Sequence, residues 1–358
     1  MDFRENGRDY IITHKNSAMK YTKAINVLLK SEIPSVRWKV LANVLEEDAD
    51  SAKMKSLQKE IKNSHLVKSL LINQNQKGEI VSSGDIYDKW QGGHWVLASL
   101  ADLGYPSGEK EIKTAVKQLL VFWLNEFYKK EFIAKSKADA RKKYGVPILN
   151  GRYRRCCSQQ GNALYSALKL GFKEDDRVHE LKKLLLKWQW PDGGWNCDKN
   201  PDADTSSFME SLIPMRSLIL YSQTFKDKIA EEASKKAAEV FLIRKLFKEK
   251  STGKIINREF PLLHYPLYWH YDILGCLKVL AEGNFICDKR CSEALDLLEG
   301  KQLEDGGFPA ESKYYTKVSN QISLGADYIN WGGTSKKKMN EWVTADALFV
   351  LKKAGRLN

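Results

Sequence analysis

The sequence predicts an all-α fold in which an inner ring of helices is wrapped by an outer ring. Three observations lead to this prediction. Apolar residues recur at helical spacing in nearly every long segment, whereas strand-like alternation is scarce. The predicted helices are of two kinds, one apolar and one amphipathic, and the two kinds alternate along the chain. A short segment of glutamine, glycines and an aromatic residue also repeats at helix ends, as expected of repeated helical units.

The helices are predicted in order from these apolar positions, because residues three or four apart share one face of a helix. A first group follows Pro34, with Val36, Val40, Leu41, Val44 and Leu45, then Trp95, Leu97, Leu100 and Leu103, then Val116, Leu119, Leu120 and Trp123. A second group has Ala163, Tyr165 and Leu168, then Val178, Leu181, Leu184 and Leu185, then Phe208, Leu212, Met215 and Ile219, then Val240, Phe241 and Ile243. The last group has Ile273, Leu274, Leu277 and Leu280, then Ala294, Leu297 and Leu298, then Val343, Leu348 and Leu351.

Four of these helices end alike, in a glycine that can take the left-handed conformation that closes a helix. These glycines are Gly104, Gly171, Gly283 and Gly355. A polar and aromatic segment precedes each of the four helices: "YDKWQGGHW", "RCCSQQGN", "HYPLYWHYD" or "NWGGTSKKKMNEW"; a fifth helix, from "DTSSFME", matches them without the glycine. More charged helices such as "VHELKKLLLKWQW" lie between them. Apolar helices are therefore expected inside and charged helices outside, around one shared core.

The charged helices end in a recurring device, which explains the aromatic stretch "WQWPDGGWNCD". It consists of Gln189, Gly193, Gly194 and Trp195, repeated as Gln302, Gly306, Gly307 and Phe308, and more weakly as Gln74, Gly78 and Ile80. The glutamine is expected to hydrogen-bond the turn that the glycines form, and the aromatic or aliphatic residue to pack back onto the ring. This interpretation makes the stretch structural.

Composition limits the class of protein. A chain of 358 residues with 43% hydrophobic residues can build a packed core, and we expect one domain over 1–358, with roughly the first 20 residues as a candidate N-terminal extension. The charged start "MDFRENGRDYIITHK" and the lack of a long apolar run predict a cytoplasmic protein without a transmembrane segment.

Cysteines and charges also limit the partners. The six cysteines are thinly spread, so free thiols are expected rather than a disulfide framework. The net charge of +13 comes from lysines scattered over outer helix faces, which argues against nucleic acid as a partner and leaves peripheral contact with a membrane open.

The segments "QWPDGGW" and "QLEDGGF" resemble the Q-x-x-x-G-x-W repeat of the terpenoid cyclase and protein prenyltransferase superfamily, from about residue 34 to the end of the chain. With "RWKVL", "KWQGGHW", "CSQQGNAL", "HYPLYWHYD" and "NEWVTADAL", the sequence is more closely similar to bacterial squalene-cyclase-like or prenyltransferase-like proteins. The resemblance implies a single α/α toroid whose inner helices surround a cavity, with functional residues where the inner helices begin.

The motifs of the superfamily's three chemistries do not carry over intact. Protonation-type cyclases use an Asp-x-Asp-Asp run, of which "NPDADTSS" offers only Asp202 and Asp204. The acids of "KEDDRV", which ionisation-type synthases would use to hold magnesium, lie at the start of an outer helix, where the helix dipole favours acids. Met209 stands where the zinc-binding histidine of protein prenyltransferases would lie, and a thioether is a poor zinc ligand.

Polar clusters before the apolar helices supply the candidate site residues, which would meet at one mouth of a toroid. The candidate catalytic residues are His270, Asp272, Asp198, Glu210, Glu341 and His94. The candidate substrate-binding residues are Trp90, Trp95, Gln159, Asn162, Asn196, Tyr265, Trp269 and Tyr271. If a metal binds, zinc is expected, with Cys157, Cys197 and His264 as the candidate ligands.

The segment "YWHYD" carries the main acid–base prediction. Pro261 and Pro266 resist helix before it, so the inner helix is expected to begin close to Tyr268, with His270 or Asp272 as the working group. An aspartate there can instead cap the helix.

Three functions remain open from the sequence. The first is a terpenoid-cyclase-like or prenyltransferase-like enzyme that binds an apolar or isoprenoid-derived small molecule in the central cavity. The second is a carbohydrate-active toroid with a carboxylate pair, either Asp272 with Glu341 or Asp198 with Glu210. The third is a non-catalytic ligand-binding toroid. An apolar closed cavity would favour the first, an open polar groove the second and a filled centre the third.

Overall fold

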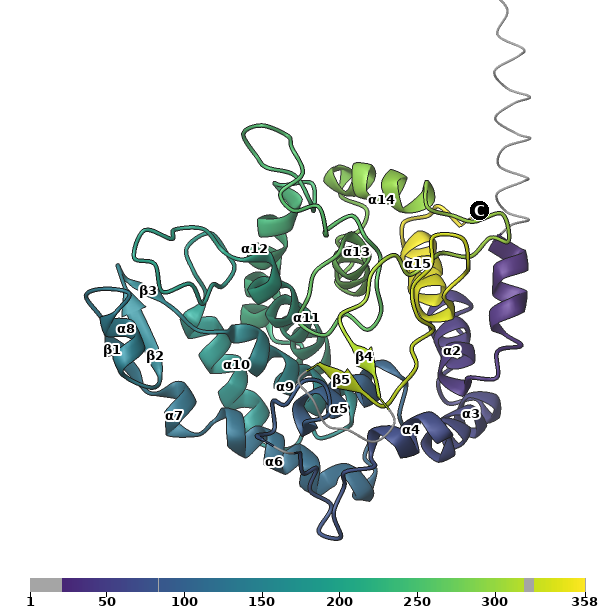
Figure 1. Ribbon diagram of the computed structural model, residues 1–358, viewed down its shortest axis with the longest axis horizontal. Helices are drawn as coiled ribbons and strands as arrows, with labels where there is room; N and C mark the ends of the chain where they lie inside the picture. The colour runs from purple at the N-terminus through teal and green to yellow at the C-terminus, as the bar shows by residue number, and fades with distance from the viewer. Residues whose placement is uncertain (1–20, 83, 319–324, 358) are drawn as a thin grey trace, which may run out of the picture.

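The computed structural model describes residues 21–82, 84–318 and 325–357, and it is mostly helical (Figure 1). The predicted N-terminal extension lies outside these residues. Residues 21–28 are helical and precede the first apolar helix. In the part of the chain that the structure describes, no helix combines the length and the apolar character needed to cross a lipid bilayer.

Six apolar segments pack on one another in succession. They are α2 (Pro34–Lys39), extended by a π-helical turn (Val40–Val44), α5 (Gly93–Asp102), α9 (Cys157–Lys169), α11 (Phe208–Phe225), α13 (Ile273–Glu282) and α15 (Glu341–Lys353). Helix α5 contacts α9, α9 contacts α11, α11 contacts α13, α13 contacts α15, and α15 contacts α2 and its π-helical turn. Helices α9, α13 and α15 bury most of their residues, and α13 buries every residue from Ile273 to Ala281. The six segments form the centre of the molecule.

A second set of helices covers this centre from outside. It comprises α3 (Ala52–Asn63) against α2, α6 (Lys113–Trp123) against α5 and α9, α10 (Arg177–Trp188) against α9, α12 (Lys228–Leu242) against α11, and α14 (Ser292–Glu299) against α13. The shorter helices are α4 (His65–Leu70), α7 (Glu126–Lys129), α8 (Asp139–Lys142) and two 3-10 turns (Lys110–Ile112, Lys289–Cys291). Each outer helix buries one stripe, as α10 does with Val178, Leu181, Leu185 and Trp188. In these pairs the more apolar helix lies toward the centre and the amphipathic helix packs against its outside.

Two small sheets depart from the expectation of an all-helical chain. Strands β1 (Glu131–Ile133), β2 (Val146–Leu149) and β3 (Arg152–Tyr153) form one sheet, with β1 parallel and β3 antiparallel to β2. It lies with α8 at the edge of the molecule, away from α13 and α15 (Figure 1). Strands β4 (Thr316–Lys317) and β5 (Ala326–Asp327) pair in parallel. Strands this short leave no alternating pattern for sequence reasoning to detect.

The glycine closures are confirmed at three of the four predicted helix ends. Gly104, Gly171 and Gly355 have φ angles of 76°, 89° and 70°. Gly283 is the exception: its φ is −90°, and the following residue, Asn284, takes the left-handed conformation with a φ of 60°. Asparagine tolerates this conformation better than most residues. The left-handed residue therefore lies one position later in the chain than predicted.

The hydrogen bond predicted for the glutamine–glycine segments is present at all three sites. Gln189 Nε2 donates to the Gly193 carbonyl at 2.6 Å. The same bond joins Gln302 to Gly306 at 3.1 Å and Gln74 to Gly78 at 3.2 Å. The aromatic residues that follow, Trp195 and Phe308, are fully buried. Trp195 also donates its indole N–H to the Leu185 carbonyl. The stretch that contains Trp195 is therefore part of the packing.

Candidate functional site

A cavity of about 90 Å³ lies among the inner helices. Most of its lining is aromatic or aliphatic, and α5, α11 and α13 each contribute residues to the wall. The apolar part of the wall consists of Trp95, Ala98, Tyr165, Leu212, Ile213, Tyr265, Pro266, Leu267, Tyr268, Leu274 and Val279. The polar residues on the wall are Ser99, Asp102, Asn162, Arg216, His264, Asp272, Lys278 and Asp346.

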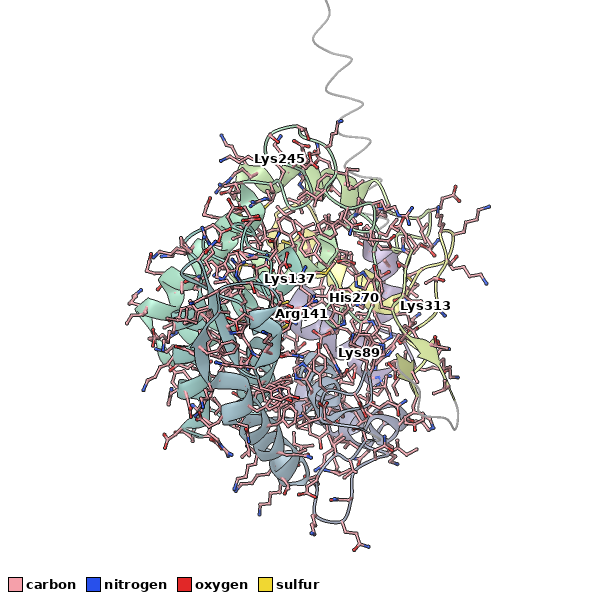
Figure 2. All side chains as sticks on the ribbon, turned by 60° about the vertical axis from the view of Figure 1, so that its left-hand side comes forward. Lys89, Lys137, Arg141, Lys245, His270 and Lys313 are labelled. Atoms are coloured by element: carbon pink, nitrogen blue, oxygen red, sulfur yellow. The ribbon has the colours of Figure 1, made fainter. Side chains whose placement is uncertain are left out.

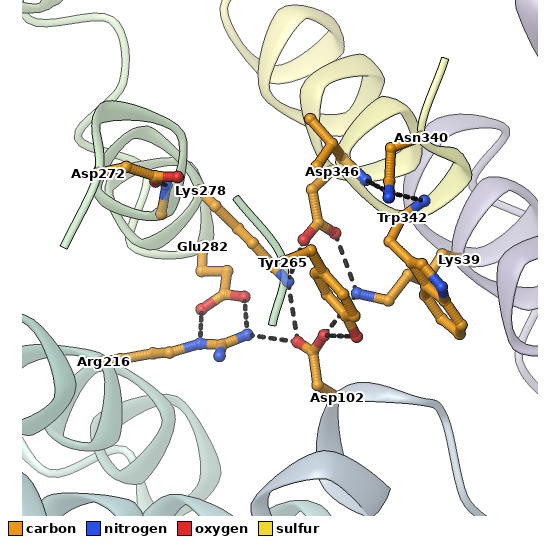
Figure 3. A network of polar contacts seen from close by, with 12 residues as sticks. Lys39, Asp102, Arg216, Tyr265, Asp272, Lys278, Glu282, Asn340, Trp342 and Asp346 are labelled. Carbon is orange, nitrogen blue, oxygen red and sulfur yellow. Dashed lines mark hydrogen bonds and ion pairs between the residues drawn. The ribbon is translucent and has the colours of Figure 1, made fainter. Parts of the chain in front are cut away.

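A buried network of charged side chains forms one end of this cavity (Figure 3). Its members are Lys39, Asp102, Arg216, Lys278, Glu282 and Asp346. Asp102 is the hub: Lys39 Nζ lies 2.6 Å away, Lys278 Nζ 2.8 Å away and an Arg216 nitrogen 3.3 Å away. A second cavity, of about 110 Å³, lies against the same network and is lined by Lys39 and Glu282 as well. The charges therefore occupy the centre of the molecule between two cavities.

The network contains three cations and three acids, so its charges cancel. The cations around Asp102 determine its protonation state. Burial alone would raise the pKa of Asp102, but Lys278, Lys39 and Arg216 together hold it well below 3.8. The same acids raise the pKa of Lys278 against the opposing effect of its own burial. Asp102 stays ionised, so it cannot serve as a proton donor near neutral pH. Sequence reasoning missed all six residues of the network.

Asp272 and His264 form a buried pair on the cavity wall. Asp272 precedes α13 and caps it, since Oδ1 accepts the Gly275 N–H at 2.6 Å. Its Oδ2 accepts the backbone N–H of His264 at 2.8 Å and lies 2.9 Å from His264 Nδ1, off the hydrogen-bond axis. The His264 side chain is fully buried, and its Nε2 has no hydrogen-bond partner among the described residues. Both residues line the cavity.

His270 lies behind this pair, outside the residues that line the cavity. Its ring stacks on Tyr314 at 3.5 Å and on Trp269 at 4.1 Å between centroids. Burial, with smaller contributions from His264 and Lys89, lowers its pKa to about 3. Figure 2 shows His270, Lys89 and Lys313 in one region of the molecule, and Lys89 Nζ lies 4.9 Å from the Trp269 ring. The predicted helix start near Tyr268 is wrong, because the Asp272 cap places it at Ile273.

His94 is held by hydrogen bonds on both ring nitrogens. Trp123 Nε1 donates to His94 Nδ1 at 3.0 Å, and Asn162 lies 3.1 Å from His94 Nε2. Because an indole only donates, Nδ1 is unprotonated and Nε2 carries the proton, so the Asn162 amide must present its oxygen to the ring. Burial lowers the pKa of His94 to about 3. These bonds make His94 a neutral packing residue.

Replacing His94 by glutamine is expected to flatten the acid side of the stability profile. A folded-state pKa near 3, below the ordinary value of 6.5, means that the unfolded chain binds a proton first as the pH falls. Unfolding free energy is therefore lost between these two values, by at most about 1.4 kcal/mol per pH unit for one group. Urea denaturation across this range should show a smaller slope for His94→Gln. The exposed His65→Gln is the control and should keep the wild-type slope.

Some of the aromatic residues predicted to bind substrate line the cavity wall, and others pack outside it. Trp95 and Tyr265 line the cavity; Trp95 donates to the Tyr87 carbonyl, and Tyr265 donates to Asp102 Oδ2 at 3.0 Å. Trp90 stacks on the cavity residue Tyr268 at 3.9 Å between centroids. Tyr271 is buried away from the cavity, where it donates to the Leu246 carbonyl.

A second polar group lies where α9 and α11 begin. The sulfur atoms of Cys156 and Cys197 and a carboxylate oxygen of Glu210 all lie within 4.8 Å of one another. Burial raises the pKa of Glu210, and the pKa of Cys197 is raised by its bond to Cys156, then by burial and Glu210.

The predicted zinc ligands Cys157, Cys197 and His264 are not brought together. Cys157 is buried in the core, and Cys156 takes the place beside Cys197, because successive residues at a helix start diverge by about 100°. Within the described residues, Cys156, Cys197 and Glu210 are the set close enough to share a metal ion.

The two predicted carboxylate pairs do not face a common cavity. Glu341 accepts a hydrogen bond from the Ser31 hydroxyl at 3.0 Å, and it does not line the cavity that holds Asp272. Asp198 is exposed and accepts the Asn200 N–H, while Asn196 donates to the Thr205 carbonyl. Neither Asp198 nor Glu210 lines the central cavity.

Searches against protein families and among curated proteins found no match. Several solved structures are similar over almost the whole chain. A protein from Actinoplanes is 13% identical with a TM-score of 0.47, covering 95% of this chain and 99% of its own. The type II terpene cyclase MstE from Scytonema is 13% identical with a TM-score of 0.44, covering 96% of this chain and 100% of its own.

Proposed function

We propose that the chain is a terpenoid-cyclase-like enzyme that binds an apolar, isoprenoid-derived molecule in the central cavity. In this proposal the fold is a single-domain α/α toroid, and Asp272 and His264 form the acid–base group. The observation that carries the proposal is a fully buried imidazole, beside a carboxylate, on a wall that is otherwise mostly aromatic and aliphatic.

The packing of the inner helices supports a closed ring. The helices contact one another in succession from α5 through α9, α11, α13 and α15 to α2. The ion pair between Lys39, the last residue of α2, and Asp102, the last residue of α5, joins the two ends of this succession. A ring of this kind places the first turns of its inner helices around one opening.

The chemistry of the pair suggests its role. Asp272 accepts two backbone N–H bonds, which fix its position beside His264. The carboxylate lies 2.9 Å from His264 Nδ1, which leaves Nε2 to exchange a proton with a ligand in the cavity. An imidazole is too weak an acid to protonate an isolated alkene. The pair therefore suits a ligand with an oxygen function, or removal of a proton from a cationic ligand.

One observation favours a ligand-binding protein without catalysis as the second candidate. The charged network fills the centre, and the cavity of about 90 Å³ is smaller than the roughly 300–1,000 Å³ of common ligand pockets. The carbohydrate-active alternative receives no such support, because its carboxylate pairs do not share the cavity.

A titration with geranylgeraniol, followed by tryptophan fluorescence, tests the proposed site, because Trp95 lies in the cavity wall. Ala98 also lines the cavity, so Ala98→Phe should fill it and raise the Kd at least about tenfold, a change of about 1.4 kcal/mol. The matched control is Ala52→Phe on the exposed start of α3, which should bind like the wild type. Equal binding by Ala98→Phe would place the ligand elsewhere.

A further inference from the structure

Three segments far apart in the chain place two thiols and a carboxyl group together outside the central cavity. Cys156 is the residue before α9, Cys197 follows the turn that contains Trp195, and Glu210 lies in the first turn of α11. Their ligand atoms lie within 4.8 Å of one another. Cys197 Sγ is 3.6 Å from Glu210 Oε1. All three side chains are partly exposed, so an ion from solvent can reach them.

This spacing matches three corners of a tetrahedral zinc site. With Zn–S bonds of about 2.3 Å and a Zn–O bond of about 2.0 Å, the sulfur–oxygen edge of a tetrahedron is about 3.5 Å and the sulfur–sulfur edge about 3.8 Å. The observed sulfur–oxygen distance of 3.6 Å is close to the first value. Small side-chain rotations would close the site around an ion.

The donor atoms select the kind of metal. Thiolate sulfur favours zinc and other thiophilic ions, whereas magnesium and calcium require oxygen ligands. Gln159 lies three residues after Cys156, a spacing that brings residues to one face of a helix, and its buried Oε1 has no hydrogen-bond partner among the described residues. That oxygen could bind the ion or accept a hydrogen bond from a water on it.

We propose that Cys156, Cys197 and Glu210 bind one zinc ion, with a fourth position open to water or a ligand. The ion would join the starts of α9 and α11 to the loop that contains Cys197. Because none of the three residues lines the central cavity, the site goes beyond the proposed function and can be tested independently of it.

Cobalt titration of the full chain, reduced and stripped with a chelator, tests this site. One equivalent of Co²⁺ should produce thiolate-to-cobalt absorption bands, and Zn²⁺ should displace it. Cys156→Ser and Cys197→Ser should lose most of the band, and Glu210→Gln should weaken cobalt binding at least about tenfold. The control is Cys287→Ser, an exposed cysteine outside the group, which should bind like the wild type.

A second measurement covers the case in which a variant does not fold. In the wild-type chain, Zn²⁺ should protect Cys156 and Cys197 from alkylation by iodoacetamide and leave Cys287 reactive, as mapped by peptide mass spectrometry. The absence of a charge-transfer band in the folded wild type would overturn the proposal. So would a full band in folded Cys156→Ser, or alkylation of Cys156 and Cys197 that zinc does not slow.

Discussion

Replacement of Asp102 by asparagine is expected to destabilise the chain by about 3–5 kcal/mol, because it leaves an uncompensated charge in a buried network. Asp102 contacts Lys39, Lys278 and Arg216, and the remaining acids cannot balance three cations. Urea denaturation near neutral pH measures this loss. Because the pKa of Asp102 is lowered in the folded state, the stabilisation is complete above the ordinary value of 3.8 and is lost as the pH falls through the folded-state value.

Two further variants show whether charge balance is the cause. Asp102→Asn combined with Lys39→Met restores neutrality and should recover part of the loss, so the two substitutions will not be additive. The exposed pair of Lys55 and Asp50 is the control, and Asp50→Asn should change the free energy of unfolding by less than about 1 kcal/mol. If Asp102→Asn were as mild as Asp50→Asn, the network would not hold the centre together.

Loss of the His264 imidazole is expected to reduce turnover about 10²–10⁴-fold, the usual contribution of a general acid–base group. His264→Gln and Asp272→Asn should both have this effect, since the carboxylate of Asp272 lies 2.9 Å from His264 Nδ1 and accepts the His264 backbone N–H. The terminal epoxide of geranylgeraniol, which carries the oxygen function that this pair suits, is the probe, with products separated by gas chromatography and identified by mass spectrometry. Because Asn can still cap a helix, Asp272→Asn should keep most of the stability of α13.

His270→Ala is the matched control for this experiment. His270 lies in the same segment but does not line the cavity, so its loss should leave turnover close to that of the wild type. A large loss in His270→Ala, with normal turnover in His264→Gln, would transfer the acid–base role to His270. Unchanged ligand binding in all three variants, with no product from the wild type, would favour the non-catalytic alternative.

The helices and their turns could be predicted because their signals are local. Periodic apolar residues indicate the buried stripe of α10, and the spacing from Gln189 to Gly193 indicates the bond that closes its end. The charged network was missed because periodicity counts apolar positions and passes over single charges. One signal was present: Lys39, Asp102, Arg216, Lys278 and Asp346 each interrupt a different apolar segment.

The candidate site was predicted only to the level of the segment. The sequence directed attention to residues 264–272, and the structure places His264 and Asp272 on the cavity wall there. It could not assign roles, because the partner of Asp272 depends on how the chain folds back before α13. The same limit explains why the sequence predicted Cys157 as a metal ligand. Neighbouring side chains diverge at the start of α9, so Cys156, and not Cys157, lies beside Cys197.

Native mass spectrometry of the purified chain, with organic extraction of any bound molecule, tests the central claim most directly. The account predicts that the wild type retains an apolar, isoprenoid-derived molecule at one per chain and that Ala98→Phe, purified in parallel, does not. A bare wild-type chain that also fails to take up added geranylgeraniol, or an adduct retained equally by Ala98→Phe, would contradict it.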